Sequence, residues 1–74
     1  LVAVLANEPG SLADVTKIIS LNDGNISNIQ VFSRDLDYYK FNIDLEVKNI
    51  THLNQIIAAM RLSEFVESVE RGKD

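Results

Sequence analysis

The sequence predicts an α+β domain in which four strands and two helices follow one another in the order βαββαβ. Three observations carry this prediction. Residues 38–48 alternate apolar and polar side chains, as a strand with one buried face does. Segments before and after this strand repeat apolar residues at helical spacing. Short apolar runs at both ends of the chain are typical of strands.

Composition limits the class of protein. Seventy-four residues, 46% hydrophobic and 24% charged, are typical of one small globular domain, and no apolar run is long enough for a membrane span. The net charge of −4, without a basic cluster, disfavours autonomous nucleic-acid binding. The absence of cysteine excludes a thiolate metal site and is compatible with a cytoplasmic origin. Because the chain opens without methionine on an apolar run, we expect residues 1–74 to be a single domain excised from a longer protein.

The first third of the chain predicts a strand, a tight turn and a helix. Residues 1–6 are continuously apolar, which favours a central strand paired on both edges. Pro9-Gly10 suits the middle of a type II turn, and Ser11 with Asp14 predicts a capping-box start. The helix is expected over 11–22. Its apolar face consists of Leu12, Val15, Ile18 and Ile19, and Gly24 is expected in the left-handed position that ends it.

The middle of the chain predicts a hairpin. Residues 25–33 alternate imperfectly, which a bulge near Ser27 or Asn28 would explain. A polar connection over 34–37 leads into the strand 38–48. The side chains of that strand expected to face the core are Tyr39, Phe41, Ile43, Leu45 and Val47. Those expected to face solvent are Lys40, Asn42, Asp44, Glu46 and Lys48.

The last third predicts a second helix and a final strand. Asn49 or Thr51 can cap the helix, and residues 65–70 form the strand, followed by a frayed end at 72–74. The apolar positions of the helix repeat at 0, 3, 4 and 7, and are Leu53, Ile56, Ile57 and Met60.

This order of elements is that of the ferredoxin-like fold, a four-stranded antiparallel sheet with two helices on one face. We expect the first and third strands in the middle, running parallel, and the second and fourth at the edges. Phe32 and Tyr38 are expected on the open face. A half-bare sheet with free edges favours pairing with a second copy.

The residues predict no catalytic or metal site. His52 has no cysteine or carboxylate at i+3 or i+4, and we interpret it as a surface or capping histidine. Asp44 and Glu46 share a face and could form an acid and base pair, but solvated charges explain them more simply. No phosphate loop or nucleophile constellation is present. An acylphosphatase-like enzyme would need an arginine, and none precedes Arg34.

One segment has latent binding chemistry. The turn at 7–11 delivers backbone N–H groups to the first turn of a helix, and such a terminus attracts anions, including carboxylates. The alternative interpretation is a well-made turn without a ligand.

Residues 7–12, the helix after them and Gly24-Asn25-Ile26 resemble the ACT domain, a small ligand-sensing regulatory module, over the whole chain. Residues 44–47, then His52-Leu53-Asn54 and the late segment 66–71, are similar to the C-terminal ACT domain of long RelA/SpoT homologues. Those are bifunctional guanosine tetra- and pentaphosphate synthetase and hydrolase enzymes (GTP pyrophosphokinases) of the bacterial stringent response.

The resemblance implies a non-catalytic regulatory domain that transmits an amino-acid or ribosome signal to upstream catalytic domains. It implies a homodimer, no cofactor, and ribosome contact only in the full-length protein. The ligand site that it implies consists of Asn7, Pro9, Gly10, Ser11, Asn25, Ile26, Ser27 and Asn28. Ile26 and Ile29 would line a small apolar pocket, which favours a branched-chain amino acid. The alternatives are a ligand-free dimerisation module and an amino-acid-sensing ACT domain of another metabolic enzyme.

Overall fold

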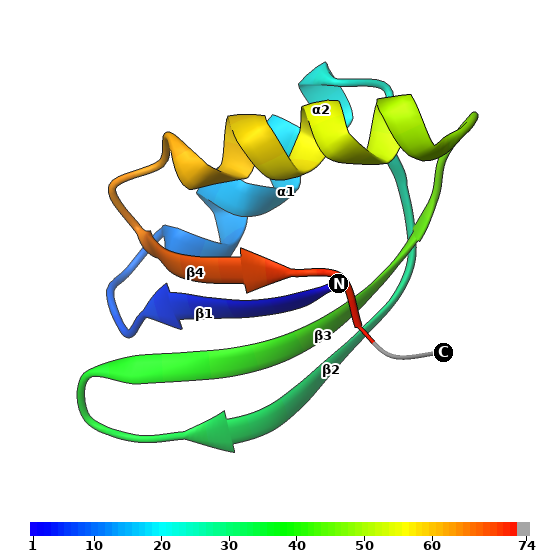
Figure 1. Ribbon diagram of the computed structural model, residues 1–74. Helices are drawn as coiled ribbons and strands as arrows, with labels where there is room; N and C mark the ends of the chain where they lie inside the picture. Colours follow the sequence, from blue (N-terminus) through cyan, green and yellow to red (C-terminus); the bar gives the residue numbers. More distant parts are fainter. Residues whose placement is uncertain (73–74) are drawn as a thin grey trace.

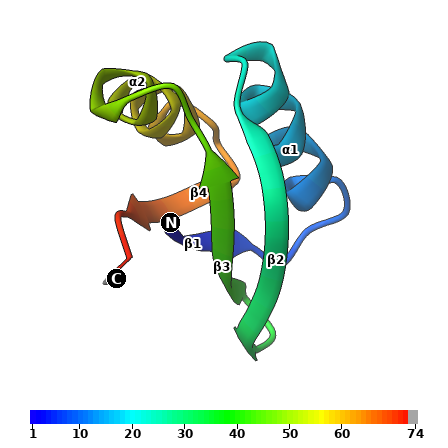
Figure 2. The ribbon, with the colours of Figure 1, turned by 90° about the vertical axis from the view of Figure 1, so that its right-hand side faces the viewer.

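A computed structural model describes residues 1–72 and confirms the βαββαβ order (Figure 1). The elements are β1 (Val2–Ala6), α1 (Ser11–Leu21), β2 (Asn25–Arg34), β3 (Tyr38–Glu46), α2 (Ile50–Arg61) and β4 (Val66–Glu70). The strands form one sheet in the order β2-β3-β1-β4. Both helices lie on the same face of this sheet, as Figure 2 shows, and no helix or strand of the described residues covers the other face, which we call the bare face. No helix in residues 1–72 is both long and apolar enough to cross a membrane.

Every pair of neighbouring strands is antiparallel, including β1 and β3. The expectation that these two middle strands run parallel is therefore wrong. The α1 crossover returns the chain so that β2 runs in the same direction as β1, and the hairpin then reverses it. As a result β3 opposes β1, with Val2 opposite Asn42 and Ala6 opposite Tyr38.

The core lies between the sheet and the helices. Its fully buried members are Ala3, Leu5, Val15, Ile19, Phe41, Ile43, Ile56, Ile57, Met60 and Val69. The predicted inner face of β3 is confirmed, because Phe41 and Ile43 are buried and their inner neighbours are packed against them. Tyr38, which shares the outward side of β3 with Lys40, is 42% exposed, and Phe32, at the second register shift of β2, is 58% exposed.

The start of α1 differs from the predicted capping box. The type II turn is confirmed: Gly10 has φ 86° and ψ −5°, and the Ser11 N–H donates to the Glu8 carbonyl at 3.2 Å. Because the helix begins directly after this turn, Gly10 occupies the N-cap and Ser11 lies inside the helix, 2% exposed. Asp14 instead accepts a hydrogen bond from the Ser63 hydroxyl at 2.6 Å. Leu12, expected in the core, is 36% exposed.

The end of α1 corrects the role of Gly24. The left-handed residue is Asp23, with φ 62°, and Asn22 is the C-cap rather than the last helical residue. Gly24 is needed for close packing, because a Cβ there would lie 2.8 Å from both Ile19 Cγ2 and Ile56 Cδ1. The glycine therefore lets α1, α2 and the start of β2 approach one another.

The β2–β3 hairpin confirms the predicted bulge and contains a second one. The register shifts between Ile26 and Asn28, and again between Val31 and Ser33. The strand extends to Arg34, and the connection is stabilised by the Asp35 carboxylate, which accepts from the N–H groups of Asp37 and Tyr38.

The remaining ends are close to the predicted ones. Asn49 caps α2, since its Oδ1 accepts the His52 N–H at 2.8 Å, whereas Thr51 lies within the helix. β3 ends at Glu46, before the predicted Lys48, and β4 begins at Val66. The frayed end expected at 72–74 falls mostly on Lys73 and Asp74, which lie outside the described residues.

Candidate functional site

The turn between β1 and α1 has the geometry expected of an anion-binding helix terminus. Beside Gly10 the space is open, because a Cβ there would meet no atom within 4 Å. Within residues 1–72, the N–H groups of Leu12 and Ala13 have no backbone partner outside the helix. The turn has no side-chain cap either. These two donors are therefore free to meet a carboxylate.

The other predicted residues of the loop contribute less to a surface site. The Asn7 side chain donates to the Asp35 carbonyl at 2.7 Å, and its backbone N–H donates to the Asp37 carbonyl at 2.8 Å. These bonds tie the loop to the end of the β2–β3 hairpin. Pro9 is exposed beside the turn, but Ser11 is buried, so its hydroxyl is not available to a ligand.

The predicted residues of β2 point to both faces of the sheet. Asn25 donates to Glu46 Oε1 at 3.1 Å, and the Ser27 hydroxyl donates to the Asp44 carbonyl at 3.2 Å. Asn28 is exposed and lies opposite Asp44, on the bare face. Ile26 is half-buried toward the helices and packed against the core.

The structure does not bring the two halves of the predicted site together. The loop after Ala6 lies level with Tyr38 of β3, whereas Asn28 is paired with Asp44, six residues further along that strand. Six residues of strand span roughly 20 Å. Figure 1 shows the β1–α1 loop and the start of β2 at opposite ends of the sheet. The reason is topological, since α1 returns the chain to the end of the sheet where β1 began.

Of the two roles predicted for His52, surface or capping, the surface role is wrong, and the contact with the C-cap residue of α1 agrees with the capping role. His52 is 8% exposed and bridges three segments. Its Nδ1 accepts the Lys48 N–H at 3.0 Å, and its Nε2 lies 2.5 Å from the Asn22 carbonyl oxygen at the end of α1. Because Nδ1 accepts a hydrogen bond, Nε2 carries the proton and donates to Asn22. This histidine joins the ends of α1 and β3 to the start of α2.

The residues considered for acid and base chemistry do not converge. Asp44 and Glu46 are both exposed on the bare face. In the part of the chain that the structure describes, no three histidine, cysteine or carboxylate side chains are placed to hold a metal ion.

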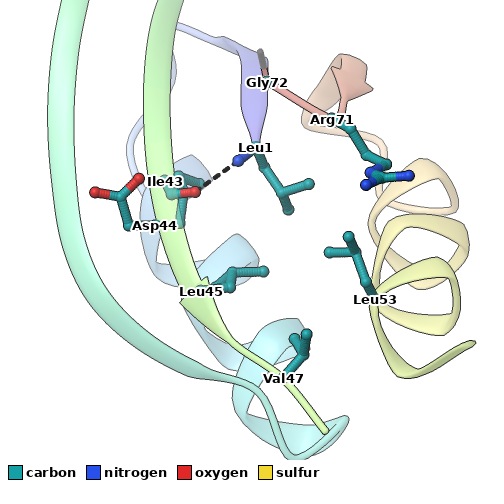
Figure 3. Close-up of a pocket in the computed structure, with 8 residues that line it drawn as sticks. All are labelled: Leu1, Ile43, Asp44, Leu45, Val47, Leu53, Arg71 and Gly72. Atoms are coloured by element: carbon teal, nitrogen blue, oxygen red, sulfur yellow. Dashed lines mark hydrogen bonds between the residues drawn. The ribbon is translucent and has the colours of Figure 1, made fainter. Parts of the chain in front are cut away.

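Sequence reasoning missed a notch at the other end of the sheet. It has a volume of about 230 Å³ and is lined by Leu1, Ile43, Asp44, Leu45, Val47, Leu53, Arg71 and Gly72. Figure 3 shows Leu1, Leu45, Val47 and Leu53 pointing toward one another, while Asp44 points away. The alternation at 45–47 predicts only that Leu45 and Val47 face the core, and it does not show which strand lies beside them.

The fold and the turn together define a small ferredoxin-like α+β domain with an open helix terminus. The comparisons with known proteins identify its family. A family model described as the ACT domain matches residues 1–71. The GTP pyrophosphokinases rsh of Brucella ovis and Brucella melitensis are 40% identical over 65 residues, which is 88% of this chain. The chain belongs to the ACT-domain family.

Solved structures agree with this assignment. The crystal structure of the ACT domain from GTP pyrophosphokinase of Chlorobium tepidum has a TM-score of 0.77 and 28% identity, covering 93% of this chain and 88% of that one. The solution structure of the same domain has a TM-score of 0.78 and 27% identity, covering 99% and 82%. By contrast, the match spans only 9% of the length of the Brucella relatives.

Proposed function

We propose that this chain is the regulatory ACT domain of a stringent-response GTP pyrophosphokinase. The observation that carries the proposal is the 40% identity to GTP pyrophosphokinase rsh over 88% of the chain. Because the relatives are much longer, the synthetase and hydrolase domains would lie upstream in the same polypeptide, in the cytoplasm. Contact with a ribosome would then depend on those neighbouring domains, since this chain carries a net charge of −4.

The proposed signal is a small amino acid bound between two copies of the domain. The loop at 7–11 and the strand residues 25–28 lie at opposite ends of the sheet, so one chain cannot use both for one ligand. In a two-fold dimer, the loop of one copy can face the second strand of the other. The carboxylate would lie against the N–H groups of Leu12 and Ala13, and Asn28 of the other copy would meet the amine.

The first experiment is a titration of the domain with the twenty amino acids, followed by amide shifts. We expect a branched-chain amino acid to shift residues 7–13 and 25–29. Gly10→Val should abolish these shifts, because a β-branched side chain is strained at φ 86° and fills the open space. Lys17→Ala, on the exposed face of the same helix, is the matched control and should bind normally. No shifts at millimolar concentration, or shifts centred on 40–48, would contradict the proposed site.

A complementation experiment tests whether two copies share each site. The Gly10→Val variant has a changed loop but intact site residues on β2. The Asn28→Ala variant has an intact loop but a changed β2. Neither variant should bind alone. In a one-to-one mixture about half of the dimers are heterodimers, and each heterodimer has one intact site of two. The mixture should therefore recover about a quarter of the wild-type sites. A site formed within one chain would show no recovery.

The second candidate is a dimerisation module without a ligand. It is favoured by one observation: Asn7 and Asn25 already have intramolecular hydrogen-bond partners. The titration distinguishes it from amino-acid sensing. An ACT domain of another metabolic enzyme would bind an amino acid equally well, and the catalytic domains encoded upstream distinguish that alternative.

A further inference from the structure

The notch lies beside the part of β3 that continues past its pairing with Leu1. The Leu1 nitrogen donates to the Ile43 carbonyl at 2.7 Å, and the Ile43 N–H donates to the Leu1 carbonyl at 2.7 Å. Beyond this pair, β3 continues to Glu46 and is paired with β2 on its other side. On the β1 side, no residue among 1–72 is paired with Asp44, Leu45 or Glu46.

This uncovered edge has the backbone groups that a strand would need. In an antiparallel ladder, every second residue directs both its N–H and its C=O toward the same neighbour. Ile43 directs both groups toward Leu1, so Leu45 directs its own pair into the empty position. An unpaired strand edge of this kind favours addition of another strand.

The side chains around the edge are apolar and only partly covered. Leu45 and Val47 of the β3 end and Leu53 of α2 are packed against the core but remain half-buried. In Figure 3 these side chains face the Leu1 side chain across the notch, with Arg71 at the rim. A strand entering here would therefore cover apolar surface as well as pair its backbone.

We propose that the notch is occupied by the polypeptide that leads into Leu1 in the longer protein, as an extension of β1 along β3. This inference rests on the proposed function, in which the domain is one part of a chain as long as its relatives. The direction follows from the geometry: β1 traced backward from Val2 passes Leu1 at Ile43 and is aimed along β3 at Leu45. A second copy would need a separate strand in that position.

Because side chains alternate along a strand, the proposal predicts which positions of the segment upstream of Leu1 are apolar and which are polar. Leu1 is opposite Ile43, whose side chain faces the helices. The first residue upstream is then opposite Asp44 on the bare face, and the second is opposite Leu45, facing the notch. The fourth is opposite Val47. We expect apolar residues at the second and fourth upstream positions and polar residues at the first and third.

Amide hydrogen exchange tests the proposal without any ligand or nucleotide, so its result is independent of the amino-acid titration. The comparison is between residues 1–74 and the natural chain extended upstream by six residues. The Leu45 amide should exchange at least about tenfold more slowly in the extended chain. Serine at the second and fourth upstream positions should remove this protection, whereas serine at the first and third should retain it.

Three results would overturn the proposal. One is an unchanged Leu45 exchange rate in the extended chain. Another is protection of Leu45 in residues 1–74 that rises with protein concentration, which would assign the notch to a second copy. The third is a natural sequence with polar residues at both notch-facing positions.

Discussion

At the scale of single residues, His52 and Gly24 hold the same junction by different means. Gly24 allows close approach of Ile19 and Ile56, and His52 hydrogen bonds to Lys48 and Asn22. Both residues act where α1, α2 and the sheet meet. A buried histidine that accepts one backbone hydrogen bond and donates another leaves two partly buried backbone groups without this partner when it is removed.

His52→Ala is expected to lower the free energy of unfolding by on the order of 2 kcal/mol or more, because the Lys48 N–H and the Asn22 carbonyl both lose their partner. Urea denaturation measures the change. Gln55→Ala, an exposed position on the same helix, is the control and should stay within about 0.5 kcal/mol. Equal midpoints for the two variants would mean that the histidine bridge contributes little.

At the scale of elements, β3 organises the domain because it pairs with both β1 and β2 and alternates between core and solvent. The inner face of β3 contributes Phe41 and Ile43 to the core, while its outer face is polar. Adjacent residues of β3 therefore differ sharply in environment: Ile43 is fully buried, and Asp44 is exposed.

Ile43→Asp is expected to unfold most of the protein, whereas Asp44→Ser should leave it folded. Burying an unpaired carboxylate costs on the order of 4 kcal/mol. The total stability of a 74-residue domain is roughly 4 to 11 kcal/mol, so little would remain. An exposed change costs less than about 0.5 kcal/mol. Thermal melts followed by circular dichroism should separate the two variants, and similar melting temperatures would contradict the assigned faces of β3.

At the scale of the whole molecule, no element within residues 1–72 covers the second face of the sheet or is paired with its two edges, β2 and β4. Tyr38 exposes apolar surface on that face, and Phe32 is 58% exposed at the second register shift of β2. The register shift between Val31 and Ser33 interrupts the outer edge of β2, which limits uncontrolled strand addition there. Association through a defined surface would cover the apolar residues.

We expect the domain to be mainly a dimer in solution at about 100 μM, because a dissociation constant of about 1 μM, well below that concentration, requires only about −8 kcal/mol. Light scattering across a concentration series measures the mass. The same series should be repeated with the chain extended upstream, since filling the notch and dimerisation are separate events. A monomer mass at every concentration would remove the basis for a shared ligand site.

The sequence by itself determined the order of elements, the inner and outer faces of β3, the type II turn at Pro9-Gly10 and the bulge at Ser27. These features depend on local alternation and on residues with restricted backbone conformations, so they can be predicted from adjacent residues of the sequence. The family resemblance, also drawn from the sequence, is confirmed by the match over residues 1–71.

Only the tertiary structure decided the antiparallel pairing of β1 with β3, the burial of Ser11 and His52, and the separation of the two halves of the predicted site. It also showed the notch beside Leu45. Each of these depends on where one element ends relative to another that is distant in sequence. Burial and strand pairing depend on how distant elements pack together. A local pattern of side chains does not show which other element lies against it.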